Sequence, residues 1–124
     1  EILDLLLSKN KNLGICTNKP QKLAEKLLGE LNLTPYFKSI LGRDMVKNSK
    51  PHPDHLIETI IDASGTQENA IFIGDTEVDF KTARNANIPV IILAHGYSPI
   101  SVKELGADFF FENNKDFKKF LLKN

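Results

Sequence analysis

The sequence has one cysteine, no long apolar run, no visible secretory signal and no excess of charge of either sign. The single Cys16 cannot form an internal disulfide, which argues against a disulfide-rich secreted scaffold. The longest apolar runs, such as residues 90–94, are far too short to span a bilayer. Sixteen basic and sixteen acidic residues cancel, so no nucleic acid or membrane partner is indicated. These absences predict a soluble protein of the cytoplasm, a reducing compartment.

Apolar periodicity divides the 124 residues into alternating short strands and helices. Strands are predicted at residues 13–16, 39–41, 70–73, 90–93 and 107–111. Helices are predicted at residues 2–7 and 116–122, with three more that begin near Pro20, Pro53 and Thr76. This alternation favours one α/β domain, residues 1–124, built on a mostly parallel sheet with helices on both faces.

The most informative stretch is residues 70–80, where an apolar run stops abruptly at Gly74 and Asp75. The run predicts a strand that is buried on both faces of a parallel sheet. Thr76 offers an N-cap for the helix that follows, and Asp79 lies four residues after Asp75, so both acids can face the same side of its first turn. Two carboxylates at the carboxyl edge of a sheet indicate Mg²⁺ with a phosphate close by. The alternative is that both acids only cap the helix.

Two further strand ends carry residues suited to phosphate chemistry. Thr17 and Asn18 follow the first strand, where a hydroxyl or amide beside free backbone N–H groups forms a cradle for phosphate oxygens. They would otherwise be ordinary N-cap residues. Lys50 is held stiffly by the neighbouring prolines before its helix, and could neutralise a phosphoryl group and pair with a carboxylate. Its alternative is a surface loop lysine.

The remaining residue types with reactive side chains carry weaker signals. Cys16 lies within a short apolar strand, which predicts a buried and unreactive thiol. His52, His55 and His95 show no spacing typical of metal ligands, and we expect them on loops or helix surfaces.

The three candidate sites stand in a fixed order along the chain. Residues 15–20 read Ile-Cys-Thr-Asn-Lys-Pro, residues 49–53 Ser-Lys-Pro-His-Pro, and residues 74–79 Gly-Asp-Thr-Glu-Val-Asp. This set resembles the second, third and fourth motifs of the haloacid dehalogenase superfamily of phosphatases, and is most similar to phosphoglycolate phosphatases. The resemblance implies a three-layer, Rossmann-like core, a Mg²⁺ cofactor and a small phosphorylated metabolite as substrate.

The resemblance also implies a role for each residue of the site. Thr17 and Asn18 would hold the phosphoryl oxygens, and Lys50 would stabilise charge on the nucleophile and the phosphoryl group. Asp75 would bind Mg²⁺, and Asp79 would bind it or orient Lys50.

One part of the family pattern is missing. No Asp-x-Asp motif, which supplies the nucleophile and the general acid/base in this family, precedes Thr17, and no cap domain does either. Residues 75–77 do not replace that motif, because the second acid is Glu77 and no later lysine and Gly-Asp pair complete the set. Since Glu1 follows no initiator methionine, we expect a carboxy-terminal core portion, incomplete at its amino-terminal side and without its central first strand.

Two consequences are expected from this missing strand. The gap would be filled by a segment of another chain, through self-association or a complementing segment, or closed by direct pairing of the strands on either side. The function is then that of a portion of a magnesium-dependent phosphomonoester hydrolase that acts through an aspartyl-phosphate and is inactive by itself. The alternative is a non-catalytic module that binds a phosphate, a cation or a protein partner.

Overall fold

The computed structural model describes residues 1–94 and 103–123, which form a regular alternation of helices and strands. The elements are α1 (Ile2–Ser8), β1 (Gly14–Cys16), α2 (Gln21–Glu30), β2 (Ser39–Leu41), α3 (Pro53–Asp62), β3 (Phe72–Gly74), α4 (Glu77–Ala86), β4 (Val90–Leu93), β5 (Phe109–Phe111) and α6 (Asn114–Lys123). Short 3-10 turns lie at Thr34–Tyr36, Arg43–Met45 and Gln67–Asn69. None of the described helices is long and apolar enough to cross a membrane.

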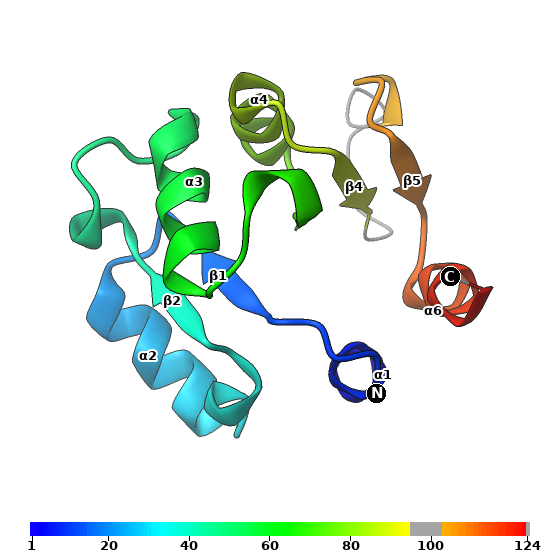
Figure 1. Cartoon of the computed structure of the whole chain (residues 1–124), viewed down its shortest axis with the longest axis horizontal. Coiled ribbons are helices and arrows are strands. Elements are labelled where there is room, and N and C mark those ends of the chain that lie inside the picture. The colour runs from blue at the N-terminus through cyan, green and yellow to red at the C-terminus, as the bar shows by residue number, and fades with distance from the viewer. Residues whose placement is uncertain (95–102, 124) are drawn as a thin grey trace.

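The strands of the described residues form two parallel sheets, with helices on both sides. In the two-stranded sheet β1 pairs with β2, and in the three-stranded sheet β4 lies between β3 and β5. Figure 1 shows α3 and α4 on one side of the strands and α1, α2 and α6 on the other. The predicted α/β class with parallel strands is therefore confirmed.

Among the described strands, β1 and β3 form no hydrogen-bonded pairing with each other. Each of these strands pairs on one edge only, β1 with β2 and β3 with β4. Direct pairing of the two, one of the two expected ways to close the gap, is therefore wrong for this structure. The sheets are held together through their helices, because α3 lies on β1 and β2, α4 lies on β3 and β4, and α3 packs against α4.

The hydrophobic core lies where α3 and α4 meet the three-stranded sheet. Its buried members are Leu56, Ile60, Phe72, Ala83, Ala86, Ile88, Val90 and Ile92. Alternation along β3 directs Phe72 into this core, where it is 8% exposed. Burying these side chains fixes the position of α4, and with it the residues at its N-terminus, relative to the end of β3.

Burial on both faces of β3, as predicted from its apolar run, is wrong. Ile71 and Ile73 are 62% and 39% exposed, because α4 covers only the face on which Phe72 lies. Along α3, Leu56 and Ile60 are buried, whereas Ile61 is 64% exposed. An unbroken apolar run thus marks a strand here without marking burial of both faces.

Candidate active site

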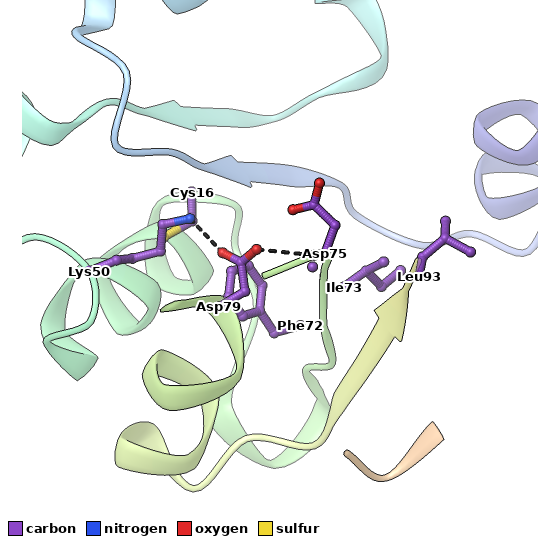
Figure 2. A pocket seen from close by; sticks show the side chains of 8 residues that line it. Cys16, Lys50, Phe72, Ile73, Asp75, Asp79 and Leu93 are labelled. Atoms are coloured by element: carbon purple, nitrogen blue, oxygen red, sulfur yellow. Dashed lines mark hydrogen bonds and ion pairs between the residues drawn. The ribbon is translucent and has the colours of Figure 1, made fainter. Parts of the chain in front are cut away.

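A cavity of about 320 Å³ lies at the carboxyl ends of β1 and β3. Its lining comes from both sheets and from the segments that follow them, as Figure 2 shows: Cys16, Lys50, Phe72, Ile73, Gly74, Asp75, Asp79 and Leu93. We call it the inter-sheet cavity. Open α/β sheets bind ligands at this edge, outside the carboxyl ends of their strands.

Lys50 and Asp79 form an ion pair on one wall of the cavity. Lys50 Nζ donates to Asp79 Oδ1 over 2.7 Å, and the two side chains are only 11% and 9% exposed. Lys50 Nζ also lies 5.6 Å from the centre of the Phe72 ring. Removing either charge would leave the other buried without its partner, which is a far larger penalty than breaking an exposed pair.

The second oxygen of Asp79 is held by the start of α4. Asp79 Oδ2 accepts the backbone N–H groups of Asp75 and Thr76 at 3.1 and 3.3 Å and the Thr76 hydroxyl at 3.0 Å. In return, the Asp79 N–H donates to Thr76 Oγ1 over 3.2 Å, which completes a capping box. The N-cap predicted at Thr76 is confirmed, and the carboxylate is fixed in the direction of Lys50.

These contacts decide the charge state of Asp79. Burial by itself would raise the pKa of this carboxyl. The hydrogen bond and charge of Lys50, together with the Asp75 N–H and the Thr76 hydroxyl, outweigh burial and hold the pKa below its ordinary value of 3.8. Asp79 is therefore a carboxylate at neutral pH, as the ion pair requires.

Gly74 is the residue that lets Asp79 approach the end of β3. A β-carbon at this position would lie 2.6 Å from both Cγ and Oδ2 of Asp79. No side chain larger than hydrogen fits there unless the carboxylate moves. The glycine at the end of the strand is required by this contact with Asp79.

Asp75 lines the same cavity, but its carboxylate points away from the Lys50–Asp79 pair (Figure 2). Within residues 1–94 and 103–123, no group of three or more His, Cys, Asp or Glu side chains is arranged to hold a metal ion. Mg²⁺ often uses only one or two protein carboxylates, with water and substrate phosphate as its other ligands. The carboxylate chemistry of Asp75 fits such an ion. Both oxygens of Asp79 accept hydrogen bonds, one from Lys50 and one from the start of α4.

Thr17 and Asn18 follow Cys16 in the chain, but unlike Cys16 they are not among the lining residues of the inter-sheet cavity. Thr17 Oγ1 accepts the Lys19 N–H over 3.1 Å, and the Thr17 N–H donates to the Leu41 carbonyl, which continues the β1–β2 pairing. The Asn18 amide donates to the Lys50 carbonyl over 3.2 Å. The structure therefore joins the loop after β1 to Lys50, and it brings Lys50, Asp75 and Asp79 to one cavity.

The structure also tests what the sequence predicts for Cys16 and the histidines. Cys16 is half-buried rather than fully buried, and burial raises the pKa of its thiol to about 11, which favours the predicted unreactive state. His52 is partly exposed and caps α3 by accepting the Asp54 N–H, and His95 lies outside the described residues. The surface position predicted for His55 is wrong, because this residue is fully buried at 0% exposure. Only its place beside Leu56, on the buried side of α3, could have indicated this.

Parallel strands in an α/β arrangement define an open-sheet protein, and the inter-sheet cavity lies at the edge where such sheets bind ligands. The chain belongs to the haloacid dehalogenase-like hydrolases, because the model of that family matches residues 1–93. The sequence resemblance is therefore confirmed at the level of the family.

Relatives of known name agree with this family. Phosphoglycolate phosphatase from Caulobacter vibrioides is 33% identical over 119 residues, which cover 96% of this chain and 50% of that protein. Phosphoglycolate phosphatase from Mesorhizobium japonicum is 41% identical over 92 residues, which cover 74% of this chain and 40% of that protein. The chain thus spans at most about half the length of these relatives.

Solved structures show the same fold. A HAD-superfamily hydrolase from Ehrlichia chaffeensis has a TM-score of 0.81 at 26% identity, covering 98% of this chain and 55% of that one. A HAD-superfamily hydrolase from Geobacter sulfurreducens has a TM-score of 0.77 at 28% identity, covering 95% and 56%. The Rossmann-like fold inferred from the sequence is confirmed by these similarities.

The Gly74–Asp79 contact predicts opposite effects for two glycine substitutions. Gly74→Ala should displace the Asp79 carboxylate and lower the free energy of unfolding by about 2 kcal/mol, since overpacking costs about 1–3 kcal/mol. Gly29→Ala is the matched control, because a β-carbon there meets nothing within 4 Å inside α2. It should raise stability by about 0.5–1 kcal/mol. Urea denaturation measures both, and equal effects would contradict the close contact.

The lowered pKa of Asp79 predicts how stability depends on pH. A carboxyl whose pKa is lower in the folded state stabilises that state above its ordinary pKa, and this contribution is lost as pH falls through the folded-state value. Asp79→Asn should therefore be less stable at pH 7, by about 3 kcal/mol, because Lys50 is left unpaired.

The difference in stability between Asp79→Asn and the unaltered chain should shrink as the pH is lowered below about 4. Asp62→Asn, at an exposed position of α3, is the control and should change stability by less than about 0.5 kcal/mol. Chemical denaturation at a series of pH values makes the comparison. A constant difference between Asp79→Asn and the unaltered chain across this range would show that Asp79 is not charged in the folded state.

Proposed function

We propose that this chain is a portion of a magnesium-dependent phosphomonoester hydrolase that acts through an aspartyl-phosphate on a small phosphorylated metabolite such as phosphoglycolate. The observation that carries the proposal is the buried Lys50–Asp79 ion pair, which lines the same cavity as Asp75 at the carboxyl ends of the strands. The chain belongs to a family of hydrolases, which supports a hydrolytic reaction. The relatives named as phosphoglycolate phosphatases support the choice of substrate class.

Each residue has a role that suits this chemistry. The Lys50 ammonium would stabilise negative charge on the phosphoryl group and on an attacking carboxylate. Asp79 would orient the Lys50 ammonium, a role supported by the hydrogen bonds that both of its oxygens already accept. Asp75 would hold Mg²⁺, which neutralises phosphate oxygens when bound. Thr17 and Asn18, at the end of β1, would contact the phosphoryl oxygens.

The nucleophile would come from outside this chain. Of the described acids, only Asp75 and Asp79 line the inter-sheet cavity, and both have other roles in this proposal. The chain alone should therefore hydrolyse no phosphate ester, because it has no carboxylate left to attack phosphorus or to protonate the leaving oxygen.

We further propose that a strand-forming segment with a terminal carboxylate occupies the space between β1 and β3. Each strand has one edge without a partner among the described strands, and Ile71 and Ile73 of the β3 segment are exposed. Parallel strands are normally covered and paired on both edges, so these edges suit an added strand. A carboxylate at its end would then lie near Lys50.

The single cysteine, without a disulfide partner, supports a cytoplasmic location.

The test is phosphoglycolate hydrolysis by the product of the coding sequence extended upstream of Glu1. Activity should require Mg²⁺ and be lost with a chelator. Lys50→Met should reduce kcat by about 10²–10³-fold, because it removes one preorganised charge at the phosphoryl group. Lys47→Met, at an exposed position three residues away, is the control and should keep full activity.

Three results bear directly on the proposal. An extended protein without activity, or equal kcat for the Lys50 and Lys47 variants, would contradict the catalytic role and favour a non-catalytic module. Hydrolysis by the present chain alone would also contradict it, because a carboxylate of this chain would then be the nucleophile.

A further inference from the structure

Lys50 is anchored at three of its groups, by residues from three different parts of the chain. Its ammonium donates to Asp79 of α4, and its carbonyl accepts the Asn18 amide from the loop after β1. Its backbone N–H donates to Nδ1 of His55 over 3.1 Å. The first contact directs the side chain, and the other two fix the peptide groups from which that side chain extends.

His55 uses both ring nitrogens for hydrogen bonds. Besides the contact of Nδ1 with Lys50, Nε2 lies 2.9 Å from the carbonyl oxygen of Leu41. A backbone N–H only donates and a carbonyl only accepts, so a single tautomer satisfies both contacts, the neutral ring with its proton on Nε2. Burial lowers the pKa of His55, and the charge of Lys50 lowers it further, which outweighs the bond to Leu41 and keeps the ring neutral.

The His55 ring connects the end of β2 with the backbone of Lys50. Leu41 is the last residue of β2, and His55 lies in the first turn of α3, which packs on β1 and β2. The fully buried ring therefore spans the distance from the carboxyl end of β2 to the backbone of Lys50. The rigid imidazole ring thus fixes the position of the Lys50 backbone relative to the carboxyl end of β2.

We propose that His55 is a positioning residue for Lys50, setting the backbone from which the ammonium reaches Asp79. Its role is to accept the Lys50 N–H while its other nitrogen is held by β2. An apolar side chain of similar size would fill the same space, but would leave the Lys50 N–H and the Leu41 carbonyl without these partners. The importance of Lys50 rests on the proposed function, whereas the test below measures only the geometry within this chain.

The first experiment is nuclear magnetic resonance on the ¹⁵N-labelled chain. We expect a scalar coupling across the hydrogen bond between the backbone nitrogen of Lys50 and Nδ1 of His55. We also expect ring ¹⁵N shifts of the neutral form protonated at Nε2. No coupling, or a ring protonated at Nδ1, would overturn the proposal without any variant having to fold.

The second experiment compares His55→Asn with His55→Leu. The amide oxygen of asparagine takes the place of Nδ1 and keeps an acceptor for Lys50, whereas leucine keeps the bulk without an acceptor. The Lys50 amide should exchange with solvent about tenfold faster in His55→Leu than in His55→Asn, as expected for loss of one hydrogen bond. The amide of Ile91, in the buried strand β4, serves as the reference for global stability.

The exchange rate of the Ile91 amide distinguishes a positioning role of His55 from a purely structural one. Faster exchange at Lys50 with no matching change at Ile91, restored by asparagine, supports a positioning role. If both amides accelerate by the same factor, or if leucine and asparagine behave alike, His55 acts only through packing and the proposal fails. This outcome would leave the proposed function of the site standing, because it does not involve the chemistry of Lys50.

Discussion

The ion pair between Lys50 and Asp79 is the interaction on which the rest of the site depends. Lys50 precedes α3, which covers the two-stranded sheet, and Asp79 belongs to α4, which covers the three-stranded sheet. The pair therefore links the two halves of the fold at one wall of the inter-sheet cavity. Such a buried pair is favourable only when its other hydrogen-bonding capacity is satisfied. The capping box at Thr76 and the absence of a side chain at Gly74 meet this condition for Asp79.

Much of this arrangement could be predicted because its causes are local in sequence. Alternating apolar segments, the prolines near helix starts and the N-cap at Thr76 specify the order and type of the elements. A strand that ends in Gly74-Asp75 before a helix places its carboxylates at the sheet edge in any parallel α/β fold. The pairing of Lys50 with a carboxylate was one of the outcomes that the motifs implied. In each case a short stretch of residues contains the physical reason.

The features that could not be predicted depend on contacts between distant segments. Exposure of Ile71 and Ile73 depends on which elements cover β3, and an apolar run does not contain that information. The burial of His55 follows from its two partners, Leu41 and Lys50, one of them fourteen residues away. The Asn18 side chain likewise contacts a carbonyl thirty-two residues along the chain. Local patterns identified the strand ends correctly, whereas the network that holds Lys50 between them appears only in three dimensions.

A double-mutant cycle between Lys50 and Asp79 tests the central claim most directly. The unaltered chain, Lys50→Met, Asp79→Asn and the double variant are unfolded in urea at pH 7, and the coupling energy is calculated from the four free energies of unfolding. A buried pair that joins the two sheets predicts a coupling of about 2 kcal/mol, because the double variant leaves no unpaired charge. Single-variant effects that add to within about 0.5 kcal/mol would contradict the claim that this ion pair holds the site together.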